Sequence, residues 1–221
     1  MAGMEGSRGK TGQGEVHDLM GERMTRKSPL LEETWRYWSS LRDGQAIPRR
    51  DALEPRSMSF TLGHSMILDR VRSGTIRVRL GGGIMHDIMG MDVRGLPVRA
   101  FFDLDVRTRA THLVEQVFET PATLEMDLLS DGPEGQLRGQ FLVLPLLDHT
   151  GRVTKALTCL GLDGPVTAPP RRFQIVDHRL SVVQGTAPVP QRRADEVRPM
   201  ELAEPQAAFE PSPVPWLRVV K

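Results

Sequence analysis

The sequence predicts an α+β fold, in which helices cover an antiparallel sheet. Two strand-like runs, 64–72 and 75–80, are separated only by Ser73 and Gly74, which is a hairpin signal. A helix with a continuous apolar stripe is predicted over 106–119. Three further strand-like runs follow that helix, and a tight-turn sequence joins two of them.

The bulk composition limits the function classes. Lys and Arg number 29 and Asp and Glu number 28, so the formal net charge is +1, and charge-driven nucleic-acid binding is not expected. Cys159 is the only cysteine, which excludes an intramolecular disulfide and a cysteine-based zinc site and fits a reducing cytoplasm. No run approaches the roughly 18 continuous apolar residues of a membrane span.

Composition also predicts three regions. Residues 1–28 are rich in glycine and charge and lack the apolar core of a secretory signal, so they are expected to form a flexible leader. Residues 29–184 are expected to form one folded domain. Residues 185–221 are dominated by proline, glutamate and alanine and are expected to be a disordered tail.

An amphipathic helix is predicted to begin at Pro29 and to end before Gly44. Its apolar and aromatic residues fall at helical spacing: Leu31, Thr34, Trp35, Trp38 and Leu41. Because two of the three tryptophans of the chain lie on this helix, it is expected to dock on another surface. A proline-bounded connector follows over 47–55.

The second strand of the hairpin alternates cleanly. Ile76, Val78 and Leu80 share one face, whereas Arg77 and Arg79 lie on the other, as expected for a half-buried antiparallel strand.

The remaining elements follow in order. A short helix is expected over 84–89, a break at 95–97 and a helical turn over 100–104. In the long helix the apolar stripe consists of Ala110, Leu113, Val114, Val117 and Phe118. Strands are expected over 122–129, 136–147 and 152–162, and 171–183 is a candidate for a further strand.

This order of elements resembles that of a PAS domain, and the motifs resemble a bacterial family of stand-alone PAS-like proteins. The residues that carry the resemblance are Trp38-Ser39-Ser40-Leu41-Arg42-Asp43-Gly44, Ile47-Pro48-Arg49-Arg50 and Arg77-Val78-Arg79-Leu80-Gly81-Gly82, with Gly90 and Gly95 after them. The match covers about 30–180 and departs at Gly82-Gly83, where the family usually has one glycine and a Thr or Ser. It implies a five-stranded antiparallel sheet with a helical lid, and a sensory or regulatory role without catalytic residues.

Motifs for catalysis are weak. Gly81-Gly82-Gly83 lacks the lysine of a phosphate-binding loop, and we interpret the glycines as allowing the backbone angles of a sharp strand-to-helix turn. Asp103 and Asp105 lie near Arg107 and Arg109, which favours a solvated charge cluster over acid–base catalysis. We therefore expect no enzymatic activity.

No cofactor or metal is expected. His112 lies on the long helix, where some haem-binding PAS domains place their iron ligand, but a structural histidine is the favoured interpretation. The six histidines lack the spacing of a metal-binding helix. Cys159 falls in a predicted central strand rather than on the helix after the hairpin, which argues against flavin photochemistry and favours a core role.

Several exposed residues are candidates for a partner surface. If Ser73 and Gly74 form a two-residue turn, Arg70 faces Arg77, and Arg72 and Arg79 share that outer face. Like charges facing each other are unfavourable, which an acidic partner or acidic residues of a packing helix would relieve. The predicted partner surface comprises Trp35, Trp38, Arg70, Arg77 and Arg79.

The sequence therefore favours a cytoplasmic, non-enzymatic sensory or adaptor protein that binds a small ligand or an unidentified partner protein, with homodimerisation through the first helix also open. The predicted cavity, which either holds a small apolar ligand or is simply core, is lined by Ile76, Val78, Ile84, Ile88, Leu113, Val117 and Met126. The alternative is an effector that binds an anionic nucleotide messenger through arginines such as Arg49 and Arg50.

Overall fold

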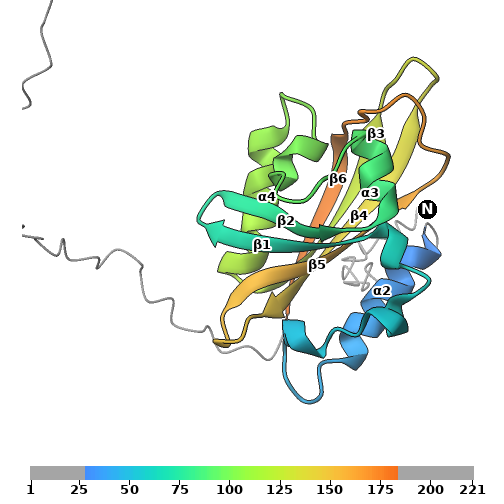
Figure 1. Cartoon of the computed structure of the whole chain (residues 1–221). Coiled ribbons are helices and arrows are strands. Elements are labelled where there is room, and N and C mark those ends of the chain that lie inside the picture. The colour runs from blue at the N-terminus through green and yellow to red at the C-terminus, as the bar shows by residue number, and fades with distance from the viewer. Residues whose placement is uncertain (1–27, 184–221) are drawn as a thin grey trace, which may run out of the picture. The chain divides into compact units, whose positions relative to one another are not determined.

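The computed structural model describes residues 28–183, which form a six-stranded sheet with helices on both of its faces (Figure 1). The strand order is β2-β1-β5-β4-β3-β6, and all neighbouring strands are antiparallel. The strands are β1 (Ser65–Arg72), β2 (Thr75–Gly81), β3 (Ala122–Ser130), β4 (Leu137–Leu147), β5 (Val153–Leu162) and β6 (Gln174–Val182). The predicted α+β fold is confirmed. The expected leader before Ser28 and the expected tail over 185–221 lie outside the described residues.

Three α-helices accompany the sheet in the described part of the chain: α2 (Pro29–Ser40), α3 (Gly83–Met89) and α4 (Arg107–Glu119). Short 3₁₀ turns occupy η1 (Arg50–Ala52), η2 (Pro55–Met58), η3 (Leu62–His64) and η4 (Val98–Phe101). Among these described helices, none is long and apolar enough to cross a membrane.

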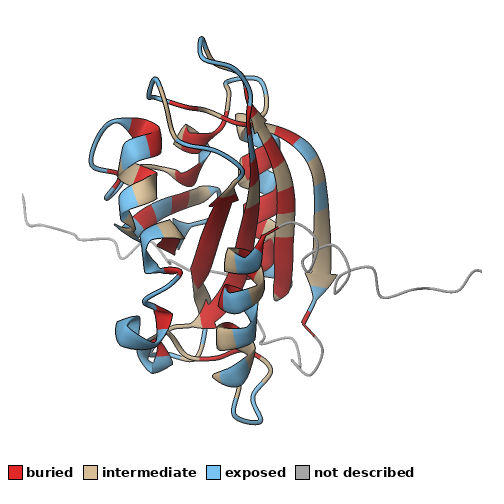
Figure 2. Cartoon of the chain, turned by 90° about the vertical axis from the view of Figure 1, so that its right-hand side faces the viewer, coloured by how far each residue is buried: buried red, intermediate tan, exposed pale blue. Residues whose placement is uncertain are grey.

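The sheet separates two apolar cores. The α4-side core is built by Leu68, Ile76, Val78, Leu113, Val117, Met126 and their neighbours. The α2-side core is built by Leu31, Trp38, Leu142, Leu144, Leu157, Cys159 and their neighbours. Buried residues are concentrated on the central strands, as Figure 2 shows. Strand β4 serves both cores because successive side chains alternate between the two faces.

Helix α2 docks on the sheet through one tryptophan rather than two. Pro29 occupies the first turn, where its missing N–H costs nothing. Trp38 is 1% exposed, and its indole Nε1 donates a hydrogen bond of 2.9 Å to the carbonyl oxygen of Pro145. Trp35 remains 38% exposed. The prediction that Trp38 belongs to a partner surface is therefore wrong, because this side chain is buried against the sheet of its own chain.

The predicted pairing of Arg70 with Arg77 is also wrong, although Arg72 does pair with Thr75 across the turn. A register shift at Val71 places Arg70 opposite Ile76 and Asp69 opposite Arg77. One extra residue in a strand turns the side chains beyond it to the other face. Arg70 therefore points to the α4 side, where its Nε donates a hydrogen bond of 2.6 Å to Glu115.

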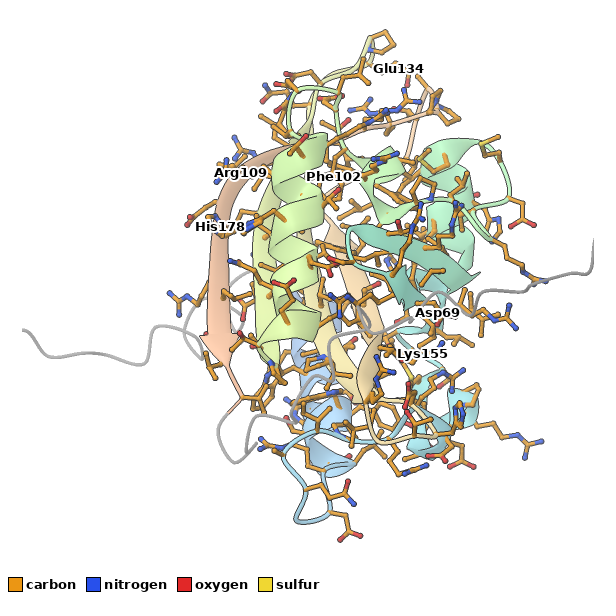
Figure 3. The ribbon with its side chains drawn as sticks, turned by 90° about the vertical axis from the view of Figure 1, so that its left-hand side faces the viewer. Asp69, Phe102, Arg109, Glu134, Lys155 and His178 are labelled. Carbon is orange, nitrogen blue, oxygen red and sulfur yellow. The ribbon has the colours of Figure 1, made fainter. Side chains whose placement is uncertain are left out.

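On the other face, the shifted register brings opposite charges together. Asp69 is opposite both Arg77 of β2 and Lys155 of β5, and it forms an ion pair of 2.8 Å with Lys155 (Figure 3). The row of arginines expected on this face is thus interrupted by a carboxylate. The like-charge repulsion inferred from the simple turn does not arise.

The sixth strand, β6, extends the five-stranded sheet that the PAS resemblance implies. It pairs with β3 and forms the edge of the sheet. His178 of β6 lies beside Arg109 of α4, with 3.2 Å between Arg109 Nη2 and His178 Nδ1 (Figure 3). Strand β6 therefore also contacts the helix that covers the α4-side core.

Candidate functional site

The structure brings all seven residues of the predicted cavity together in the α4-side core. Six of them are buried, and Ile84 is partly buried and packs against the others. They lie together because α4 packs against β2 and β3, and the side chains of α3 pack into the same core. Ligand binding at this centre stays a prediction.

An apolar pocket of about 420 Å³ lies instead beside the segment that connects α2 to β1. We call it the connector pocket; its lining comprises Arg50, Leu53, Pro55, Met58, Leu62, Gly63, Ser65, Met66, Ile67, Leu80, Gly81, Gly82, Gly83 and Leu157. Leu53, Met58 and Leu157 are buried lining residues, whereas Leu62 and Leu80 are 46% and 45% exposed. The pocket is therefore an opening at the edge of the α2-side core.

The connector is held in place by backbone bonds. The amide of Leu147 in β4 donates to Pro48 O at 2.9 Å, and Arg49 forms a bridge with Leu147. The three short turns η1, η2 and η3 then carry the chain around the pocket to the start of β1. Tyr37 of α2 accepts a hydrogen bond of 2.7 Å from the amide of Glu54, which ties the connector to the helix.

The glycine turn forms the opposite wall, for a reason that differs from the predicted one. None of Gly81, Gly82 and Gly83 has a positive φ, and Gly82 has φ −73° and ψ 169°. A Cβ on Gly82 would collide with the carbonyl oxygens of Leu62 and Gly63. A side chain is thus excluded by the close approach of η3, not by the backbone angles.

The close contact between Gly82 and η3 gives a direct prediction. Gly82→Ala is expected to destabilise the protein by about 1–3 kcal/mol, because the backbone at η3 must move to accept the methyl group. Gly83→Ala is the matched control, since a Cβ there meets nothing within 4 Å. Urea unfolding followed by circular dichroism measures both. Equal stability of the two variants would contradict the close contact.

The charge of the connector pocket comes from one side chain. Arg50 is the only ionisable residue of the lining, and it is partly exposed. No hydrogen bond or ion pair joins its guanidinium to any residue that the structure describes. The neighbouring Arg49, by contrast, is 3.2 Å from Asp51, and this hydrogen bond lowers the pKa of the Asp51 carboxyl. The guanidinium of Arg49 is therefore engaged by a carboxylate, whereas that of Arg50 is available to bind a ligand.

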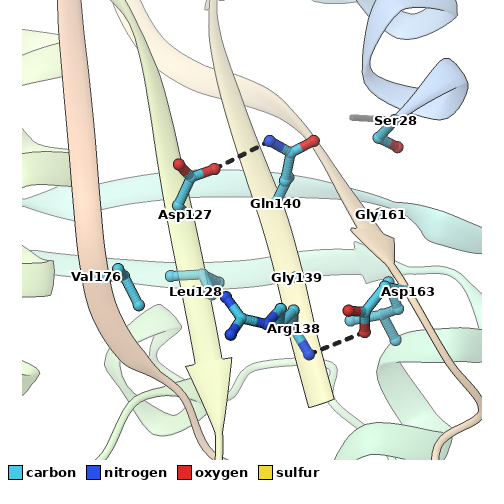
Figure 4. A pocket seen from close by; sticks show the side chains of 10 residues that line it. Ser28, Asp127, Leu128, Arg138, Gly139, Gln140, Gly161, Asp163 and Val176 are labelled. Atoms are coloured by element: carbon cyan, nitrogen blue, oxygen red, sulfur yellow. Dashed lines mark hydrogen bonds between the residues drawn. The ribbon is translucent and has the colours of Figure 1, made fainter. Parts of the chain in front are cut away.

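A second pocket, of about 400 Å³, has a lining of mixed polar and apolar residues (Figure 4). It lies over β3, β4 and the end of β5, near Ser28 at the start of the described chain. Gln140 donates a hydrogen bond of 2.9 Å to Asp127, and the amide of Arg138 donates one of 2.9 Å to Asp163. Two of its acidic lining residues, Asp127 and Asp163, thus accept hydrogen bonds within the pocket.

The residues weighed for chemistry have structural surroundings. Burial raises the pKa of the Cys159 thiol to about 11, despite opposing hydrogen bonds with Thr34 and Ser65, so the thiol is unreactive at neutral pH. Asp103 and Asp105 both accept hydrogen bonds from Gln174. His112 is exposed on α4. Within 28–183, no three His, Cys, Asp or Glu side chains are grouped as a metal would require.

An antiparallel sheet that contains the order β2-β1-β5-β4-β3, with α4 over one face, α2 over the other and a packed core on each side, fits the class of PAS domains. The family model described as "PAS domain" matches residues 26–161, more than half of the chain, and the chain belongs to this family. The resemblance inferred from the sequence motifs is confirmed.

The solved structures add only distant likenesses. One, described under a flavin analogue in a light-oxygen-voltage domain, is 16% identical with a TM-score of 0.40, over 49% of this chain and 83% of that one. VqmA bound to DPO is 14% identical with a TM-score of 0.36, over 49% and 56%. A Vibrio cholerae VqmA dimer is 16% identical with a TM-score of 0.36, over 49% and 52%. At these scores neither function nor ligand transfers. Among curated proteins, none matches the sequence.

The connector pocket was missed because one part of its lining, from Arg50 to Gly63, comes from segments without periodicity. Met58, Phe60 and Leu62 are alternate apolar residues in the stretch that joins the proline-bounded connector to the first strand. This short alternation is the sequence signal that indicates a buried surface there. Arg50 was considered as an anion-binding residue, and the structure places it in the lining of the pocket.

Proposed function

We propose that this PAS-family chain is a non-enzymatic sensory protein that binds a small apolar ligand in the connector pocket and passes the signal to a partner protein. Membership of the PAS family implies a sensory or regulatory role. The observation that carries the ligand proposal is the pocket itself. Its volume lies within the range of about 300–1,000 Å³ that small-molecule sites have, and its lining is mostly apolar.

A partner surface is proposed at three residues, Trp35 of α2 and Arg77 and Arg79 of β2. All three side chains are exposed. Arg70 and Trp38 are not included in the proposed surface, because Arg70 forms an ion pair with Glu115 and Trp38 is hydrogen-bonded to Pro145 of the same chain. A cytoplasmic protein without nucleic-acid binding, with an unidentified partner protein or a second copy of itself, remains our expectation.

The proposal is tested on the whole chain. We expect a purified sample to release a small molecule on denaturation, which mass spectrometry identifies, and we expect Leu62→Trp to reduce its amount by filling the mouth of the pocket. Leu104→Trp is the control, since Leu104 is 78% exposed and does not line the pocket. A ligand that is unaffected by Leu62→Trp would place the site elsewhere, with the α4-side core as the first alternative.

A further inference from the structure

We infer that the ligand of the connector pocket is an amphipathic monoanion, with an apolar body that contacts the buried lining and one carboxylate that binds Arg50. This inference rests on the proposed function and adds the chemical class of the ligand. It combines two observations of the described structure, the apolar lining and the unpaired guanidinium within it.

The lining specifies the body of the ligand. Leu53, Met58 and Leu157 offer buried aliphatic and thioether surface, and Leu62 and Leu80 extend it outwards. The one hydroxyl, on Ser65, already donates a hydrogen bond of 2.8 Å to Thr61 O. A polar body would lose hydrogen bonds to water without replacement, whereas an alkyl chain or an apolar ring gains by burial.

The guanidinium specifies the head group. An arginine fork matches the two oxygens of a carboxylate, and such charge-assisted bonds are stronger than neutral ones. Several other arginines of the described domain have protein partners: Arg36 has Glu32 and Glu33, Arg70 has Glu115, and Arg171 has Ser130 and Gly135. Arg50 stands at an apolar pocket without one.

The number of charges specifies a monoanion. With Arg50 the only ionisable residue of the lining, a second negative charge would lie against leucine and methionine side chains. Arg49 does not neutralise a second negative charge of the ligand, because it forms an ion pair with Asp51. The geometry therefore disfavours the nucleotide messenger that the two arginines suggest in the sequence, since such messengers carry several charges on a polar body.

The test uses octanoate and 1-octanol as probes, titrated into the full-length chain by calorimetry at pH 7.5. We expect octanoate to bind more tightly than octanol. Arg50→Gln should weaken octanoate by roughly 10- to 100-fold, the size of a charged hydrogen bond, and leave octanol unchanged. Arg49→Gln is the matched control and should change neither affinity. Leu62→Trp should reduce the binding of both probes.

The outcomes separate this inference from the proposed function. Equal binding of both probes, blocked by Leu62→Trp and insensitive to Arg50→Gln, would keep the ligand pocket and overturn the anionic head group. Binding of neither probe would overturn both. Octanoate binding that depends equally on Arg49 and Arg50 would show a general response to positive charge, and would also contradict the inference.

Discussion

Trp38→Ala is expected to lower the free energy of unfolding by about 3–5 kcal/mol, the largest effect of any single substitution considered for this chain. The indole is almost fully buried in the α2-side core and contacts the sheet at β4. Its removal leaves a cavity under α2 and takes away the donor that bonds to Pro145 O at 2.9 Å. A buried carbonyl that loses its partner adds to the cost of the cavity.

Trp35→Ala provides the control within the same helix. Trp35 lies three residues away and is 38% exposed, so its replacement should cost less than about 1 kcal/mol. Urea denaturation monitored by far-ultraviolet circular dichroism gives both values, since each variant retains enough helix and strand signal. Similar losses for the two variants would show that α2 is not docked through Trp38.

The contrast between the two tryptophans has a consequence for assembly. The sequence alone leaves both aromatic side chains in need of burial, and dimerisation through this helix is one solution. In the structure, the chain buries Trp38 itself, and only Trp35 remains for a partner. A homodimer through α2 would thus rest on one aromatic side chain and its exposed neighbours rather than on an aromatic stripe.

Much of the fold follows from periodicity. The bounds of α4 and of strands β1 to β5 lie within two residues of the predicted ranges. Helical spacing in α4, alternation in β2 and β3, and apolar runs bounded by turn residues in the other strands are all local signals. Gly90 ends α3 with φ 66°, as a glycine after a helix commonly does. These features depend on local sequence, and the sequence was sufficient for them.

What could not be predicted depends on single residues or on irregular segments. The turn at Ser73-Gly74 was recognised, yet the shift at Val71, which no residue type announces, reverses the face of Arg70. The three 3₁₀ turns between Arg50 and His64 have no periodic pattern, so the connector pocket could not be assembled from sequence. The predicted cavity residues were found together because they all follow helix or strand periodicity.

Arg70 carries the second large effect. Its side chain is 17% exposed and Glu115 of α4 is 8% exposed, and the two form an ion pair, with Glu119 at 3.7 Å as an outer partner. Removing one charge leaves the other without its counter-ion in a buried place. We expect Arg70→Met to cost about 3 kcal/mol, at the low end for a buried pair because Arg70 retains some contact with solvent.

The double variant Arg70→Met/Glu115→Leu identifies the cause. It replaces both charges by apolar groups of similar length and should recover most of the lost stability, to within about 1 kcal/mol of the wild type. Arg77→Met is the control on the opposite face. Arg77 is exposed and donates one hydrogen bond, to Gly95 O at 2.8 Å, so a change of no more than about 0.5–1 kcal/mol is expected.

The position of Arg70 also decides how partner binding should be tested. On the unshifted register, alanine at Arg70 and Arg77 would probe one outer surface together. With Arg70 bound to Glu115, a loss of partner binding in an Arg70 variant would reflect a weakened contact between β1 and α4. Arg77 and Arg79 are therefore the substitutions that probe the surface. If Arg70→Met proved as stable as the wild type, Arg70 would not be buried in its pair with Glu115, and the outer face would regain it.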